Sequence, residues 1–260
     1  MKVVILAGGL GTRISEETEN KPKPMVLLDD NPILWHLMNI FSIQGFDEFV
    51  LALGYRGDVV KRWLLDLNEI HGSIKIDTST KRIEHMGVSI SSSWRVTALE
   101  TGLNTQTGGR ISQSMRGLPN ETIIATYGDG LANIPIKSLI AFHKSQGKLA
   151  TVTAVRPPAR FGHLEIKDGV VEHFGEKNQS DAGWINGGFF VLEPEVINYI
   201  SSNDEAFESG ALPRLVAENQ LSAFCHEGFW QPMDTLRERN ELARLAELST
   251  PPWLNGISGN

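Results

Sequence analysis

The chain of 260 residues is 41% hydrophobic and 21% charged, which is typical of a globular protein that buries a substantial core. Its single cysteine, Cys225, excludes an internal disulfide and a cysteine-rich zinc site, and its net charge of -7 argues against a broad nucleic-acid-binding face. No apolar run approaches the roughly 20 residues of a membrane span, and the run at residues 3–7 is too short for a signal peptide. We therefore expect a soluble, cytoplasmic protein with no nucleic-acid or membrane partner.

Strands and helices alternate along the first half of the sequence. Residues 2–7 form a continuous apolar run with β-branched side chains, which is typical of a buried parallel strand. After a glycine- and proline-rich segment, a helix is predicted to begin at Pro32, with Asn31 as its N-cap, and to end before Gly45. The next predicted elements are a strand at 48–53, a helix at 58–70, strands at 96–100 and 122–127, a helix at 135–146 and a strand at 149–155.

The pattern changes in the second half of the chain. The turn signal Asp168-Gly169 predicts a hairpin over residues 163–174. A further strand is predicted at 187–192, with helices near 194–201, 209–219 and 235–247. The β-loop-α-β-α order predicts an α/β fold, in which a Rossmann-like, mostly parallel mixed sheet is flanked by helices and accompanied by a small β-rich portion.

A glycine-rich loop directly follows the first predicted strand, at Gly8-Gly9-Leu10-Gly11-Thr12-Arg13. Glycines at such a strand end let backbone N–H groups approach a phosphate closely, and Arg13 adds a fixed positive charge. The dinucleotide pattern fails because residue 14 is Ile14, and the P-loop pattern lacks its Gly-Lys-Ser/Thr. An ordinary tight turn is the alternative, but the downstream Lys21-Pro22-Lys23-Pro24 favours a phosphate loop.

The glycine loop together with the segment Lys21 to Met25 resembles the signature of the sugar-nucleotide pyrophosphorylases. Within that family, the exact residues of the segment most resemble the cytidylyltransferases that act on glucose 1-phosphate. The resemblance runs from residue 1 to about Asp234 and is weakest at about 66–95. It implies a nucleotide-diphospho-sugar transferase fold. It also places Lys23 on the substrate phosphates, whereas Lys21 is expected to be solvated. The flanking prolines restrict the backbone beside Lys23 and so present its ammonium at a lower entropic cost.

Two aspartates are candidate metal ligands. Asp129, in Gly128-Asp129-Gly130, follows the strand at 122–127, and Asp234 lies in Gln231-Pro-Met-Asp234. By themselves they would be a turn residue and the N-cap of the helix from Thr235. The resemblance implies that both hold Mg²⁺, an ion that prefers hard oxygen ligands.

The loop at residues 101–110 and two later segments complete the expected site. The resemblance implies that Thr105 and Arg110 recognise the base. Because arginine only donates hydrogen bonds, an Arg110 that faces the acceptors O2 and N3 would favour cytosine. The residues implied for the sugar and its phosphate are Glu176, Lys177, Asn186 and Gly187, although Asn178 replaces the proline that related enzymes carry after Lys177.

The resemblance implies that the protein converts CTP and glucose 1-phosphate into CDP-glucose and pyrophosphate, with Mg²⁺ as cofactor. Arg13 and Lys23 are the expected catalytic residues. The residues expected at the nucleotide are Leu6, Ala7, Gly8, Gly9, Leu10, Gly11, Thr12, Arg13, Lys23, Thr105, Arg110 and Gly128. The alternatives are the same chemistry with UTP, dTTP or another sugar 1-phosphate, and a non-catalytic module that binds sugar nucleotides.

We expect a single domain over residues 1–260 that forms a homo-oligomer. Within this domain, residues of about 1–155 form the nucleotide-binding core and residues of about 156–235 the sugar-binding portion. Residues 236–260 form a C-terminal helix and tail.

Overall fold

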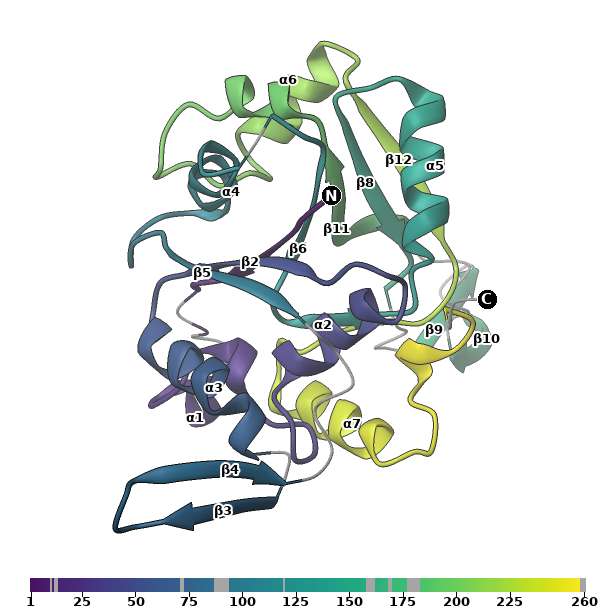
Figure 1. The fold of residues 1–260 in the computed structure, drawn as a ribbon. Helices are drawn as coiled ribbons and strands as arrows, with labels where there is room; N and C mark the ends of the chain where they lie inside the picture. Colours follow the sequence, from purple (N-terminus) through teal and green to yellow (C-terminus); the bar gives the residue numbers. More distant parts are fainter. Residues whose placement is uncertain are drawn as a thin grey trace.

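A seven-stranded sheet is the centre of the computed structural model, which describes residues 1–9, 11, 14–70, 73–86, 94–118, 120–157, 162–167, 170–176 and 183–257 (Figure 1). Its strand order is β12-β8-β11-β6-β1-β2-β5. Every pairing is parallel except those of β11, which runs antiparallel to both β6 and β8. The mostly parallel mixed sheet predicted from the sequence is confirmed. The strands are β1 (Val3–Ala7), β2 (Glu48–Leu53), β5 (Arg95–Glu100), β6 (Ile123–Tyr127), β8 (Ala150–Val155), β11 (Ile185–Leu192) and β12 (Leu221–His226).

Successive side chains of a strand point to opposite faces of the sheet, and in the inner strands both sets are apolar. Helices therefore cover both faces of this sheet. In β1, Val3 and Ile5 pack into one core, and Val4 packs into the other. The first core lies under α2 (Ile33–Ser42), α3 (Gly57–Ile70), α5 (Ile136–Gln146) and α7 (Leu236–Ala246). The second lies under α4 (Thr107–Arg116), the 3-10 helix η4 (Pro194–Tyr199) and α6 (Ala211–Ala217), and Figure 1 shows α4 and α6 together on that side.

Several boundaries differ from the sequence-based expectations. The helix expected from Pro32 begins at Ile33, and the predicted N-cap Asn31 is wrong, because Pro32 takes that position and no side chain caps the helix. The backbone N–H of Asn31 instead donates to the Asp29 carboxylate at 2.8 Å in a local turn. The segment predicted as a helix near 194–201 is a 3-10 helix. The helix end at Gly147 is confirmed, with the left-handed φ of 58° that favours glycine.

Three small two-stranded units accompany the main sheet. The predicted hairpin is confirmed as β9 (Gly162–Lys167) and β10 (Val170–Glu176), although its turn residues Asp168 and Gly169 lie outside the described residues. A second hairpin, β3 (Ser73–Asp77) and β4 (Arg82–Met86), lies within the segment where the resemblance is weakest and projects from the body in Figure 1. The third unit, β7 (Gly130–Ala132) with β13 (Trp230–Pro232), was not predicted. The remaining short helices are α1 (Ser15–Thr18), η2 (Lys23–Met25) and η5 (Pro252–Leu254).

The register brings the chemically interesting loops to one edge of the sheet. Ala7 pairs with Leu53, Leu53 with Glu100, and Leu6 with Tyr127, so the carboxyl ends of β1, β2, β5 and β6 meet there. Because β11 is antiparallel, its first residues and not its last reach this edge. Ligands of open α/β sheets bind at such an edge. Within the described ranges, no helix combines the length and the apolar character needed to span a membrane.

Candidate active site

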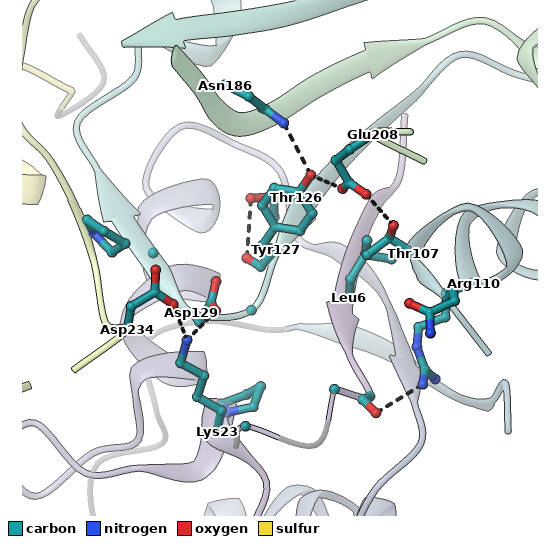
Figure 2. A pocket seen from close by; sticks show the side chains of 18 of the residues that line it. Leu6, Lys23, Thr107, Arg110, Thr126, Tyr127, Asp129, Asn186, Glu208 and Asp234 are labelled. Carbon is teal, nitrogen blue, oxygen red and sulfur yellow. Dashed lines mark hydrogen bonds and ion pairs between the residues drawn. The ribbon is translucent and has the colours of Figure 1, made fainter. Parts of the chain in front are cut away.

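A cavity of about 750 Å³ opens at this edge of the sheet (Figure 2). It gathers residues that lie far apart in the sequence, and most of those singled out by sequence reasoning line it. The predicted residues in its wall are Leu6, Gly8, Gly9, Gly11, Lys23, Thr105, Arg110, Gly128, Asp129, Asn186, Gly187 and Asp234.

Six other predicted residues are not placed in the cavity wall. Ala7 packs into the first core, so its side chain points away from the cavity. Leu10, Thr12, Arg13 and Lys177 lie outside the described residues. Glu176 is the last residue of β10, and its side chain is likewise outside the described part.

Lys23 joins the two predicted metal ligands. Its ammonium lies 2.6 Å from the Asp129 carboxylate and 2.8 Å from the Asp234 carboxylate. Figure 2 draws both ion pairs. The Lys23 side chain is 11% exposed, and the aspartates are 33% and 28% exposed. Burial alone lowers the pKa of Lys23, but the two carboxylates outweigh it and raise the pKa above its ordinary value. The ammonium therefore stays charged at neutral pH.

The β7–β13 ribbon brings the two aspartates together. Pro232 pairs with Gly130, and the Met233 N–H donates to the Asp129 carbonyl at 2.8 Å, which fixes Asp234 beside Asp129. The alternative role of Asp234, as the N-cap of the helix from Thr235, is wrong. Thr235 caps α7 in a capping box with Glu238, whose carboxylate accepts from the Thr235 N–H at 2.9 Å. The Asp234 carboxylate faces Lys23 instead.

Close backbone packing explains Gly128 beside this centre. A Cβ at Gly128 would lie 2.9 Å from Cγ of Pro24 and 3.0 Å from the Leu6 carbonyl oxygen. Glycine at this position therefore lets the loop that carries Asp129 approach the loop that carries Lys23.

Arg110 connects the glycine loop to two neighbouring strand ends. It lies in the first turn of α4 and not in a loop as expected, and it is 4% exposed. Its Nη1 donates to the Leu53 carbonyl at 2.9 Å and to the Thr101 hydroxyl, and its Nη2 donates to the Gly8 carbonyl at 3.0 Å. Burial lowers the pKa of this guanidinium from its ordinary value. A Cβ at Gly8 would lie 2.1 Å from Nη1, so only glycine admits this contact.

These hydrogen bonds limit how Arg110 could recognise cytosine, the role predicted for it from the sequence. Nη2 also donates to the Leu103 carbonyl at 3.4 Å, so all four Nη hydrogens point to protein oxygens. A guanidinium has five N–H donors. Contact between a base edge and either Nη would therefore require exchange of a protein hydrogen bond.

Comparisons with known proteins identify the family. A family model described as nucleotidyl transferase matches residues 2–237. The chain is 45% identical over 256 residues to glucose-1-phosphate cytidylyltransferase of Salmonella typhimurium, across 97% of this chain and 98% of that protein. It is 42% identical over 254 residues to probable glucose-1-phosphate cytidylyltransferase of Bacillus subtilis, across 97% and 99%. The chain belongs to the nucleotidyl transferase family.

A solved structure shares the fold of this nucleotidyl transferase. The crystal structure of HddC from Yersinia pseudotuberculosis matches with a TM-score of 0.67 at 23% identity, over 94% of this chain and 98% of that one. The mixed sheet and its flanking helices are therefore a shared architecture, and the family resemblance read from the glycine loop and Lys-Pro-Lys-Pro segment is confirmed.

Sequence reasoning missed the wall of the cavity opposite Lys23. Tyr127, Thr107 and Glu208 line this wall together with Asn186. Burial and then the charge of Glu208 raise the pKa of Tyr127, so its hydroxyl keeps its proton and donates to the carboxylate. Tyr127 could have been noticed because it immediately precedes Gly128-Asp129. Nothing in the local sequence marks Glu208, which lies in a connection 81 residues away from Tyr127.

Gly188 provides a test of how tightly this wall is packed. Its φ of 80° favours glycine, and a Cβ would lie 2.3 Å from Cδ2 of Tyr127. We expect Gly188→Ala to lower the free energy of unfolding by about 2–5 kcal/mol, because backbone strain adds to overpacking. Gly147→Ala is the control, since its φ is 58° but nothing lies within 4 Å of the added Cβ. Urea unfolding of both variants measures the difference, and equal losses would contradict the packing argument.

Asp129 and Asp234 present the type of donor atom that a divalent cation takes. Two carboxylates already converge on a cation, the Lys23 ammonium. Carboxylate oxygens are the donors that Mg²⁺ prefers, and the ion takes about six oxygens, most of which water or phosphate can supply. Among the residues that the structure describes, no group of three or more His, Cys, Asp or Glu forms a competing metal cluster.

Proposed function

We propose that this protein joins CTP and glucose 1-phosphate to give CDP-glucose and pyrophosphate. The observation that carries the proposal is the Lys23 ammonium held between Asp129 and Asp234 beside the glycine loop, in a cavity of about 750 Å³. This arrangement suits polyphosphate chemistry, since a cation and backbone N–H groups meet at one edge of the sheet. The two cytidylyltransferases that share 45% and 42% identity over nearly their whole lengths support the choice of substrates.

The reaction needs positioned charges and no protein nucleophile. A phosphate oxygen of glucose 1-phosphate, already ionised at neutral pH, forms a bond to the α-phosphorus of CTP. The bond from that phosphorus to the bridging oxygen breaks, and pyrophosphate leaves with both bonding electrons. In this proposal, Lys23 holds the negative oxygens of the attacking and attacked phosphates close together. Arg13 and the amides of the glycine loop neutralise the departing pyrophosphate.

Asp129 and Asp234 would hold Mg²⁺ in this proposal, and the ion would supply charge neutralisation at the reacting phosphates. Occupation of that place requires the Lys23 ammonium to leave its position between the two carboxylates. The incoming phosphate oxygens offer the ammonium a new anionic partner, so substrate binding and the exchange favour one another.

The expected sugar and base contacts also belong to this proposal. Asn186 and Gly187 would meet the hexose, with Glu176 and Lys177 at the sugar and its phosphate. Thr105 would line the base site. Arg110 would shape it by fixing the loops that surround the base, since its Nη groups are bonded to protein oxygens. We also propose a cytoplasmic homo-oligomer, and light scattering on the purified protein would test its oligomeric state.

Pyrophosphate release tests the reaction directly. We expect release from CTP with glucose 1-phosphate and Mg²⁺ to exceed release from UTP, dTTP, ATP or GTP by at least about tenfold in kcat/KM, because a site built for one base leaves polar groups unpaired with another. Preference for a different nucleotide would keep the mechanism and reject the base assignment. No release from any nucleotide, with nucleotide binding intact by calorimetry, would indicate a binding module instead.

A further inference from the structure

A chain of hydrogen bonds crosses the wall of the cavity that lies opposite Lys23 (Figure 2). The Asn186 amide nitrogen donates to the Tyr127 hydroxyl at 3.3 Å, and that hydroxyl donates to Oε1 of Glu208. The Thr107 hydroxyl donates to Oε2 of Glu208 at 2.7 Å. The chain therefore joins the start of β11, the end of β6 and the start of α4 through one carboxylate.

The orientation of this carboxylate is fixed from both ends. The Thr107 hydroxyl accepts from the Phe207 N–H at 2.9 Å, so its own hydrogen is directed to Glu208. The Asn186 carbonyl oxygen accepts from the Gly188 N–H at 2.8 Å, which directs its amide group to Tyr127. A side chain whose donors are themselves fixed loses little entropy when it binds a ligand.

Attachment of the surrounding segment does not depend on the Glu208 side chain. Residues 203–207 are joined to the start of α4 by main-chain bonds from the Gln106 N–H to the Asn203 carbonyl at 2.9 Å and from the Gly108 N–H to the Glu205 carbonyl at 3.1 Å. Phe207 is fully buried in the second core, which anchors the segment further. Glu208 itself is exposed in the cavity wall.

The carboxylate keeps acceptor capacity that its two protein donors do not use. An ionised carboxylate has about four lone-pair sites, and Tyr127 and Thr107 occupy one on each oxygen. A negative charge in this wall repels phosphates and attracts donors. The ligand groups that match it are therefore uncharged hydroxyls, at a place separated from the phosphate centre at Lys23.

We propose that Glu208 is a specificity-determining residue that accepts hydrogen bonds from sugar hydroxyls, positioned for this by Tyr127 and Thr107. The inference rests on the proposed function, since it assigns part of the same cavity. The hexose and the ribose of a sugar nucleotide offer the same hydroxyl chemistry. Asn186, at one end of the chain, belongs to the expected hexose site, whereas Thr107 lies in the expected base loop, so the experiment separates the two sugars.

Calorimetric titration of CDP-glucose, CDP and the 2′- and 3′-deoxy forms of CDP tests the assignment. We expect Glu208→Ala to weaken CDP-glucose binding by about 10–100-fold, the range for loss of a hydrogen bond to a charged group. Glu208→Gln, which keeps an acceptor oxygen, should lose less. If the hexose is the donor, CDP binds Glu208→Ala as it binds the unaltered protein. If the ribose is the donor, CDP also weakens, and one deoxy form binds both proteins equally.

Glu195→Gln is the matched control, because Glu195 is an exposed glutamate of η4 that does not line the cavity. It should bind every ligand as the unaltered protein does. Thermal midpoints of all variants check the fold, and Glu208→Gln keeps the test decisive if Glu208→Ala unfolds. If both Glu208 variants bind every ligand with unchanged affinity, the inference is wrong. That result would not contradict the proposed reaction, which is measured separately by pyrophosphate release. Binding that depends on Glu208 in a protein that releases no pyrophosphate would overturn the proposed reaction alone.

Discussion

Lys23→Met is expected to reduce turnover of CTP and glucose 1-phosphate by about 10³–10⁵-fold, the range seen when a cation that stabilises a phosphoryl transition state is removed. The ammonium of Lys23 is nearly buried and lies within 2.8 Å of both aspartates, so the substitution removes the cation at the centre of the site. Initial rates of pyrophosphate release measure the effect. Lys21→Met is the control, because Lys21 lies on the same loop but pairs with Glu17 at 3.5 Å.

The same variant gives a second readout that does not depend on turnover. In Lys23→Met, the carboxylates of Asp129 and Asp234 lose the cation that separates their charges. Added Mg²⁺ should therefore raise the thermal midpoint of the variant more than that of the unaltered protein, in which the ammonium competes for the same place. Equal shifts in both proteins would contradict the exchange between ammonium and metal, and near-normal turnover would remove Lys23 from the reaction.

Asp129→Asn and Asp234→Asn are expected to lower kcat by about 10²–10⁴-fold each and to raise the Mg²⁺ concentration for half-maximal rate. The amide keeps the shape of the side chain but removes the charge that attracts a hard cation. Because both carboxylates act on one ion, the double variant should be little worse than either single variant. Steady-state rates across a Mg²⁺ series provide the measurement.

An aspartate that lies away from the cavity controls for the loss of a surface charge in this experiment. Asp66 is exposed on α3 and does not line the cavity, so Asp66→Asn should leave both the rate and the Mg²⁺ dependence unchanged. If the loss of kcat in the double variant equals the product of the two single losses, the two carboxylates act separately and the shared site is rejected.

The sequence alone was sufficient where the physical signal is local. A continuous apolar run predicts the buried strand β1. The glycines after it predict a loop whose backbone takes conformations, and admits close contacts, that only glycine tolerates. Glycine at position 147 marked the end of α5 for the same reason, and the structure shows its left-handed φ of 58°. The Lys-Pro-Lys-Pro segment is likewise a local pattern, and together with the glycine loop it indicates the family.

Tertiary structure decided what depends on side chains that meet across long sequence separations. Asp129 and Asp234 were chosen by resemblance, but their convergence on Lys23 comes from the unpredicted β7–β13 ribbon, whose pairing depends on the whole fold. Arg110 was expected in a loop at the base. It lies in α4, because Gly108 and Gly109 let that helix pack against Glu205 and Asn203, where an added Cβ would lie 2.7 and 2.4 Å from their carbonyl oxygens.

Glu208 shows this limit most clearly. It lies in an exposed connection before α6, and no periodicity, cap or motif distinguishes it from the other acidic residues of the chain. Its place in the cavity exists only because Phe207 is buried in the second core and Thr107 stands at the start of α4. Local sequence determines a strand or a glycine turn, because the forces act between near neighbours. A shared carboxylate is determined only by packing that brings distant segments together.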